Sequence, residues 1–122
     1  MRIISIANHK GGTAKTTTAR TLGDYMAMRG YKTLLIDLDP QAALTMACGF
    51  KEAVYPSMVD VIGGAQPGDI PITEVIRKVK PKLSLAPANL NLSGCELGIT
   101  SRIGREYIVK RALEGLDYDL AI

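Results

Sequence analysis

The sequence has few of the residues that hold metals through sulfur or imidazole. It contains one histidine, His9, and two cysteines, Cys48 and Cys95, which lie far apart and form no C-x-x-C motif. Zinc sites are built from cysteine and histidine at short spacings, so this composition argues against one. We expect the two cysteines to be buried thiols in a reducing compartment.

Long hydrophobic runs are also missing. The apolar stretch at the N-terminus, residues 3–7, is far shorter than a signal peptide or a membrane span. The sequence therefore predicts a cytoplasmic protein with no membrane association. The net charge of +3 permits an anionic partner and identifies none.

What is present is an ordinary globular composition. The 122 residues are 47% apolar and 22% charged, without repeats or low-complexity tracts. This length is enough for one domain with a real core, so we expect a single domain over residues 1–122.

The first third of the chain predicts a βαβ unit. Residues 3–7 carry isoleucine on both faces, which is typical of a strand buried on both sides. Apolar residues recur at helical spacing over 16–29, and Gly30 is placed to end that helix. Residues 33–36 predict a second buried strand. A strand, a helix and a strand in this order make the two strands parallel.

The rest of the chain predicts shorter elements. Ser57 and Thr73 are expected helix N-caps, and the late helix is expected to turn Ile103, Tyr107 and Leu113 inward. The Gly/Pro-rich residues 63–71 predict a surface loop. The expected helices are 41–49, 57–64, 72–79 and 104–116, and the expected strands are 82–88 and 117–122.

Residues 8–15 predict a phosphate-binding loop between the first strand and the first helix. Gly11 and Gly12 let the backbone turn sharply and approach an anion closely. The N–H groups of residues 12–17 would then point into one concavity at the positive end of the helix dipole. Lys15 is placed to reach the β- and γ-phosphates of a nucleotide.

Hydroxyl, lysine and carboxylate groups accompany this loop. Thr16 is placed to ligate Mg²⁺ and Thr17 to donate to the α-phosphate. Lys10 is a second cation, and two lysines suit a triphosphate better than a simple anion. Asp37 and Asp39 follow the strand one crossover away, where acids opposite a phosphate loop indicate a site. The alternative is a tight turn and a loop whose charges are only solvated.

The loop departs from the common G-x-x-x-x-G-K-[ST] pattern, because His9 and Ala14 occupy the glycine positions. If residue 14 needs a positive φ, its Cβ costs about 1 kcal/mol. If residue 14 is right-handed, alanine costs little. The sequence leaves both conformations open.

The stretch "KGGTAKTT" matches the deviant Walker A motif, K-G-G-x-x-K-[ST], and the chain resembles the ParA/MinD ATPases, in particular ParA/Soj-type partition ATPases. The resemblance covers the whole chain through "LLIDLDPQAALT", "LAPANLNLSGCE" and "GREYIVKRAL". It implies an α/β, three-layer P-loop NTPase fold with a mainly parallel sheet. Family members are longer and continue into a hydrophobic-D-x-P-P segment, so we expect a truncated, N-terminal portion.

The resemblance also implies residue roles. Lys10, Lys15 and Asp39 would be catalytic: Lys10 would touch the phosphates of a partner subunit, and Asp39 would orient the attacking water. Asp37 would lie near the metal through a water, beside the metal ligand Thr16. The nucleotide contacts would come from Gly11, Gly12, Thr13, Ala14, Lys15, Thr16 and Thr17.

Two further segments have competing interpretations. The resemblance places residues 89–96 near a dimer interface, whereas Asn89 and Asn91 could equally cap the backbone of a turn. A basic cluster near the late helix does not share one face, so we expect solvation and not DNA contact. The cluster consists of Arg102, Arg105, Lys110 and Arg111.

The function implied by the resemblance is a Mg²⁺-dependent ATPase that partitions plasmid or chromosomal DNA through ATP-driven dimerisation. ATP, ADP and Mg²⁺ would be its cofactors. A second copy, a ParB-like adaptor and non-specific DNA would be its partners, in the cytoplasm and on the nucleoid. The alternatives are a membrane-linked, MinD-like positioning ATPase and a non-catalytic nucleotide-binding or interaction module. These 122 residues alone are expected to hydrolyse ATP poorly, because the later acid of the family site is absent.

Overall fold

The computed structural model describes residues 1–63, 70–100 and 102–122. The predicted loop 63–71 therefore falls mostly outside the described residues. Among the helices that are described, none is both long and apolar enough to cross a membrane.

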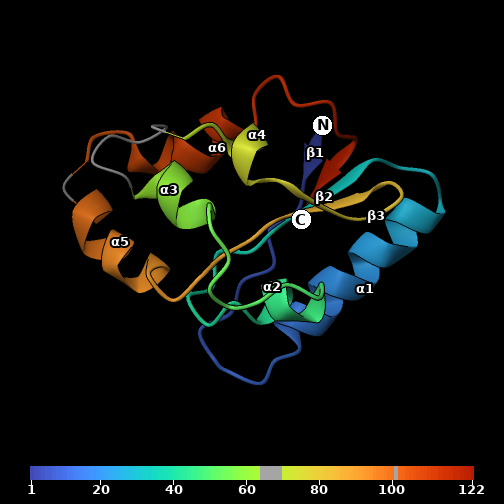
Figure 1. Cartoon of the computed structure of the whole chain (residues 1–122), viewed down its shortest axis with the longest axis horizontal. Helices are drawn as coiled ribbons and strands as arrows, with labels where there is room; N and C mark the ends of the chain where they lie inside the picture. Colours follow the sequence, from blue (N-terminus) through green and yellow to red (C-terminus); the bar gives the residue numbers. More distant parts are fainter. Residues whose placement is uncertain (64–69, 101) are drawn as a thin grey trace.

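A five-stranded sheet with the order β1-β5-β2-β4-β3 forms the centre of the molecule (Figure 1). All neighbouring strands are parallel except β3, which pairs antiparallel with β4 at one edge. The predicted mainly parallel sheet is confirmed, although β5 separates the two strands of the expected βαβ unit. The strands are β1 (Arg2–Ile3), β2 (Thr33–Ile36), β3 (Arg77–Lys80), β4 (Leu83–Ala86) and β5 (Leu120–Ala121).

Helices cover both faces of this sheet, which confirms the three-layer architecture (Figure 1). One face carries α1 (Lys15–Met28) and α2 (Ala43–Ala47). The other carries α3 (Met58–Ile62), α4 (Ile72–Val75), α5 (Leu92–Thr100) and α6 (Ile108–Ala112).

Strand β2 is buried between the two helical layers. Leu34 packs into the apolar cluster on the α3–α6 face, and Leu35 packs into the cluster on the α1–α2 face. Both side chains are fully buried. A continuous apolar run such as "TLLI" is what a parallel strand covered on both faces requires, and the strand predicted over 33–36 is confirmed.

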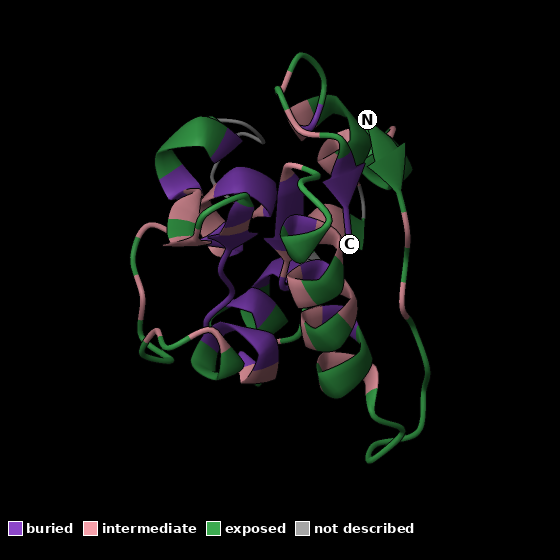
Figure 2. Ribbon diagram, turned by 90° about the vertical axis from the view of Figure 1, so that its right-hand side faces the viewer, coloured by how far each residue is buried: buried purple, intermediate pink, exposed green. Residues whose placement is uncertain are grey.

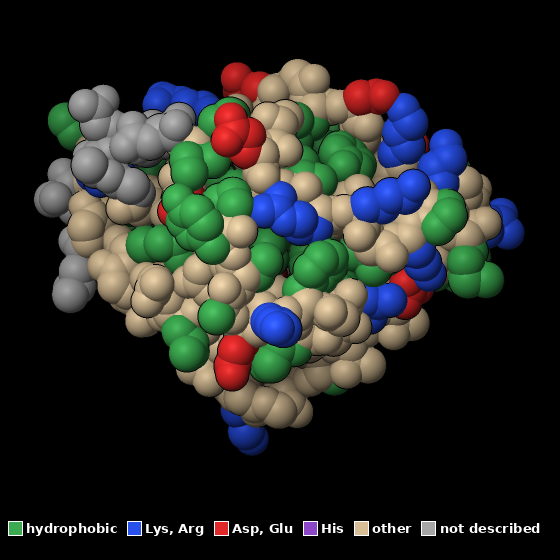
Figure 3. All heavy atoms as spheres, viewed as in Figure 1, with side chains coloured by type: hydrophobic (Ala, Val, Ile, Leu, Met, Phe, Trp, Pro, Cys, Tyr) green, Lys and Arg blue, Asp and Glu red, His purple; other side chains and the backbone are tan. Residues whose placement is uncertain are grey.

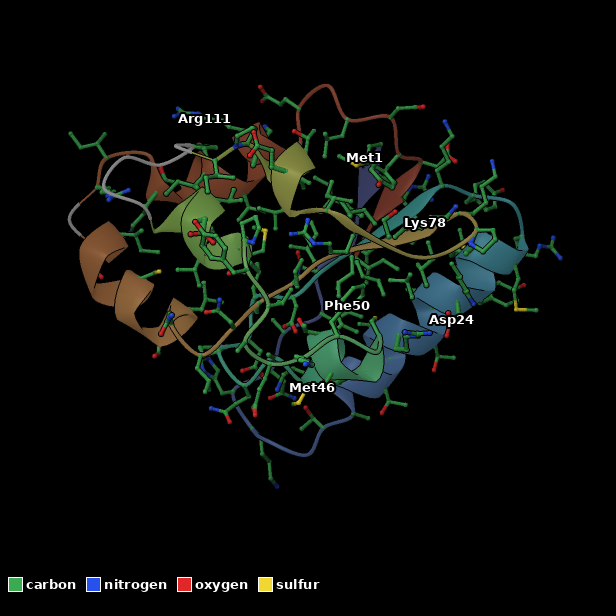
Figure 4. The ribbon with its side chains drawn as sticks, viewed as in Figure 1. Met1, Asp24, Met46, Phe50, Lys78 and Arg111 are labelled. Carbon is green, nitrogen blue, oxygen red and sulfur yellow. The ribbon has the colours of Figure 1, made fainter. Side chains whose placement is uncertain are left out.

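The helices around this core begin and end where local signals place them. Helix α1 ends before Gly30, which has a φ of 91°, as the sequence predicts. The Ser57 side chain accepts from the Val59 N–H and caps α3, and Asp60 completes a capping box. After α2, Phe50 packs into the cluster on the α1 side of the sheet (Figure 4).

The first strand differs from its prediction in length and burial. Strand β1 contains only Arg2 and Ile3, and Ile3 is 51% exposed. It lies at the edge of the sheet and pairs with β5 alone, in a ladder that ends at Ala121 (Figure 2). The expectation of a strand buried on both sides over 3–7 is wrong, because isoleucines on both faces do not reveal that a strand lies at an edge.

The prediction of a helix over 72–79 is also wrong beyond the first turn, because α4 ends at Val75. Helix α4 has Pro71 and not Thr73 at its N-cap. The Arg77 guanidinium donates to the carbonyl groups of the three preceding residues, at 2.7–3.3 Å. These bonds satisfy carbonyl groups at the C-terminal end of α4. The chain then continues as strand β3.

The prediction of a late helix over 104–116 is correct only in part. A 3₁₀ turn, η1 (Arg105–Tyr107), precedes the short α6. Leu113 is buried as predicted, but Ile103 is fully exposed and Tyr107 is half-exposed, so the inward prediction fails for both. Gly104, with a φ of 76°, turns the chain before the helix and removes Ile103 from the helical repeat.

The cysteines differ slightly from expectation. Both are free thiols, and Cys95 is buried, but Cys48 is only partly buried. Burial raises the pKa of each thiol above its ordinary value.

The edge strand β3 has the sequence RKVK, and Lys and Arg side chains lie among hydrophobic ones on this side of the molecule (Figure 3). Lys78 is exposed on this strand (Figure 4), and Lys80 lies 2.6 Å from the Asp24 carboxylate of α1. Burial alone would raise the pKa of Asp24, but hydrogen bonds from Lys80 and Arg20 hold it below the ordinary value. Lysines on an edge strand discourage pairing with another chain.

Gly23 of α1 provides a test of how closely the helix packs on the sheet. A Cβ added there would lie 2.8 Å from Leu35 and 3.3 Å from Leu83. We expect Gly23→Ala to lower the free energy of unfolding by about 1–3 kcal/mol through overpacking, although alanine is the better helix former. Urea denaturation measures this.

The matched control is Gly94→Ala in α5, where an added Cβ meets no atom within 4 Å. This change should be neutral or stabilise by up to about 1 kcal/mol. Equal effects of the two substitutions would contradict the packing described for α1.

Candidate functional site

A cavity of about 560 Å³ opens where β1 and β2 end and α1 begins. Lys15 and Thr16 contribute to its wall from the first turn of α1, and Asp37 and Asp39 contribute from the segment after β2. Parallel strands deliver their carboxyl ends to one edge of the sheet, and this edge is where open α/β sheets bind ligands. Four of the predicted site residues therefore share one cavity.

The predicted phosphate loop runs exposed from Asn8 to the start of α1. The Asn8 side chain accepts from the Lys10 N–H at 3.1 Å, and the Thr13 hydroxyl donates to the Lys10 carbonyl at 3.2 Å. Gly12 has a φ of 70°, and an added Cβ at Gly11 or Gly12 would meet nothing within 4 Å. The loop is therefore an open turn in which the backbone is accessible.

Ala14 adopts the left-handed conformation, with φ 60° and ψ 25°. This answers the question that the sequence leaves open: the residue bears a strain of about 1 kcal/mol. Ala14 is the N-cap of α1, and no side chain caps the helix there. The first N–H groups of a 14-residue helix thus lack a side-chain cap, an arrangement that favours an anion.

The lysines of the loop occupy different positions. Lys15 is half-buried and lines the cavity with Thr16, whereas Lys10 is exposed and is not among the cavity residues. Thr17 lies exposed in the same first turn. Lys10 is therefore available to a group outside this cavity.

The Asp37 carboxylate is buried and fully engaged. One oxygen accepts from the Asp39 N–H at 3.1 Å. The other accepts from the Thr45 N–H at 2.9 Å and from the Thr45 hydroxyl at 2.7 Å. These donors orient the carboxylate at the cavity wall.

Asp39 is exposed at the mouth of the cavity. Its side chain accepts from the Gln41 N–H at 2.9 Å, and its carbonyl accepts from the Ala42 N–H. The carboxylate thus shapes the turn into α2, and its other oxygen accepts no hydrogen bond from the residues that the structure describes. That oxygen can accept a hydrogen bond from water.

The available ligands fit Mg²⁺ bound together with a phosphate. The Thr16 hydroxyl and the Asp37 carboxylate line one cavity, and such hard oxygen groups suit this ion. Within residues 1–63, 70–100 and 102–122, no cluster of three or more His, Cys, Asp or Glu could hold a metal by itself. Mg²⁺ is commonly bound by one or two protein oxygens, substrate phosphates and water.

Thr45 is the residue of this region that sequence reasoning missed. It is fully buried in α2 and bonds both to Asp37 and to the Ala88 N–H, the latter at 3.0 Å. A polar residue in the run "QAALTMA" was the available signal, but only the fold shows that its partner is a carboxylate eight residues earlier.

Asn89 has a clear structural role. Its amide donates to the Ser57 hydroxyl at 3.0 Å and the Val54 carbonyl at 3.1 Å, and its oxygen accepts from the Asn91 N–H. The backbone-capping interpretation is confirmed for Asn89. The interface role of residues 89–96 stays a prediction.

Three members of the basic cluster, Arg105, Lys110 and Arg111, are exposed, and Arg102 is partly buried. Lys110 lies 6.0 Å from the Tyr107 ring centre. These positions agree with the expected solvated surface.

Comparison with known proteins gives related chains and structures. A family model described as an AAA domain matches residues 1–122. The chain is 36% identical to the sporulation initiation inhibitor protein Soj of Bacillus subtilis over 129 residues, covering 99% of this chain and 48% of Soj. It is 35% identical to the chromosome partitioning protein ParA of Caulobacter vibrioides over 117 residues, covering 95% of this chain and 43% of ParA.

Among solved structures, the chain is similar to cobyrinic acid a,c-diamide synthase from Mycobacterium smegmatis with a bound ATP analogue and magnesium. The TM-score is 0.91 at 38% identity, over 100% of this chain and 50% of that one. The chain thus spans about half the length of the relatives it matches.

Replacing Ala14 with glycine tests the strain in the loop. Glycine adopts positive φ without steric cost, so Ala14→Gly should raise the free energy of unfolding by up to about 1 kcal/mol. Thermal unfolding without nucleotide measures this.

Ala47→Gly in α2 is the control, because that alanine is exposed and helical. Glycine there should lower stability by up to about 1 kcal/mol. A loss of stability at both positions would mean that Ala14 is not strained.

Proposed function

We propose that this chain, which belongs to the AAA-domain family and within it to the ParA/Soj type, binds ATP with Mg²⁺ and hydrolyses it. The observation that carries the proposal is the shared cavity. It joins a lysine and a threonine at the N-terminus of α1 to two carboxylates at the end of β2. This combination suits phosphoryl transfer, which depends on positioning and on neutralising charge.

Each residue has a task in this proposal. The uncapped N–H groups of α1 and its loop, together with Lys15, bind the triphosphate. Thr16 and Asp37 would hold Mg²⁺, the latter through a water, and the ion supplies charge neutralisation at the phosphates. Asp39 orients a water whose oxygen forms the new bond to the γ-phosphorus, while the bond to the bridging oxygen of ADP breaks and the proton lost by the water passes to the released phosphate.

Lys10 takes a separate role. Because its side chain is exposed and outside the cavity, it can reach the phosphates of a second copy and neutralise charge on the transferred group. Nucleotide would then bridge two chains, so dimerisation would depend on ATP.

The biological role that we propose is partitioning of plasmid or chromosomal DNA in the cytoplasm, with a ParB-like adaptor and non-specific DNA as partners. The name of the Caulobacter relative and the similarity to Soj support this role. A MinD-like membrane function has no supporting observation in the described residues. A non-catalytic module is the outcome if nucleotide binds without turnover.

The name of the Mycobacterium structure suggests another use for the same nucleotide site, namely amide formation. Both functions require binding of ATP. They differ in whether its hydrolysis serves DNA partitioning or the formation of an amide. Formation of an amide on a cobyrinic acid substrate, dependent on ATP, would favour this second candidate.

Loss of Lys15 should greatly weaken nucleotide binding. We expect Lys15→Ala to weaken Mg-ATP binding at least about 100-fold, because the proposed charge-assisted contact with phosphate is lost. Isothermal titration calorimetry measures it. Lys78→Ala removes the same charge from the exposed edge of the sheet and should bind like the wild type; equal binding by all three proteins would overturn the proposal.

Binding and turnover should separate at Asp39. Asp39→Ala should keep Mg-ATP affinity within about threefold while phosphate release falls at least about 100-fold, since a group that orients the nucleophile acts mainly in the transition state. Phosphate release is measured beside titrations. Unchanged turnover in the variant would remove Asp39 from the mechanism.

A further inference from the structure

Thr45 occupies an unusual position for a threonine. It lies inside the short helix α2 and is fully buried. A buried hydroxyl must find partners, and a helical threonine usually finds one in the preceding turn of its own helix. Here the hydroxyl bonds instead to Asp37 and to the N–H of Ala88.

The hydroxyl joins three parts of the fold. It donates to the Asp37 carboxylate at the end of β2 and accepts from the Ala88 N–H beyond β4. The Thr45 N–H donates to the same Asp37 oxygen. One residue therefore supplies two of the three donors that hold this carboxylate, while the third comes from Asp39.

We propose that Thr45 is a positioning residue for the metal side of the site, acting through Asp37. The inference rests on the proposed binding of Mg-ATP. Hydrogen bonds from outside the coordination shell fix the orientation of a carboxylate near a metal. With Thr45 in place, Asp37 is held at the cavity wall before the ion arrives, and no reorganisation is needed on binding.

The same bond ties the site to the opposite helical layer. Ala88 precedes Asn89, whose amide donates to Ser57, the N-cap of α3. The hydrogen bonds of Thr45 and Asn89, joined by the backbone between Ala88 and Asn89, thus connect the cavity to α3. The Thr45 hydroxyl is the link between the carboxylate and the segment after β4.

The test compares Thr45→Val, which keeps the shape and removes the hydroxyl, with Thr45→Ser, which keeps the hydroxyl. Calorimetry measures ATP affinity with Mg²⁺ and with a chelator. Thr45→Val should reduce the gain in affinity due to Mg²⁺ about tenfold or more, with ATP affinity in chelator changed less than about twofold. Thr45→Ser should restore most of the gain.

Thr33→Val is the matched control. Thr33 is also fully buried, lies at the other end of β2 and donates its hydroxyl to the Tyr31 carbonyl. It should share the loss of stability caused by removing a buried hydroxyl and should leave the Mg²⁺-dependent gain intact. If Thr45→Val keeps that gain, or if Thr33→Val loses it equally, the positioning role is overturned.

Hydrogen exchange of the wild-type chain gives a second readout, which stands even if Thr45→Val does not fold. The amides of Thr45 and Ala88 should be protected, and Mg-ATP should slow their exchange more than ATP with chelator does. Equal protection by Mg-ATP and by ATP with chelator would overturn the inference about Thr45 and leave the proposed ATP binding standing. Absence of any ATP binding by the wild type would overturn the proposed function as well.

Discussion

Burial of β2 on both faces is the constraint on which the rest of the structure depends. Leu34 and Leu35 face different helical layers, and the strand lies in the middle of the sheet. The residues that follow are then delivered to the edge where α1 begins. The acids gain their position from the hydrophobic run that precedes them.

The site combines one rigid wall and one open wall. Asp37 is fixed by three donors within the fold, whereas the loop that bears Lys10 is exposed and held by few contacts. Such a division suits a ligand that must enter and leave, because the carboxylate is held in place while the loop is open to solvent. It also suits a lysine that acts on a second molecule.

The sequence predicts the parts of this structure that local patterns determine. The strand at 33–36, helix α1 and the cap at Ser57 each have a signal within a few residues. The gathering of Lys15, Thr16 and the two acids also follows, because parallel strands share an edge.

Long-range features could not be predicted in this way. The exposure of Ile3 depends on which strand pairs with β1, and the end of α4 depends on where the Arg77 side chain turns. The role of Thr45 depends on contacts with β2 and β4. Each of these properties depends on residues distant in the chain or on the direction of a side chain, and neither is visible in a local sequence pattern.

The left-handed Ala14 has a consequence for recognition. A glycine would relieve the strain, yet it would also let the unliganded loop sample many more backbone conformations. In the proposed function, alanine lowers folding stability but restricts the loop, so fewer backbone conformations are lost when a phosphate binds. In this loop, the residue that lowers the stability of the unliganded chain can raise the affinity for the proposed ligand.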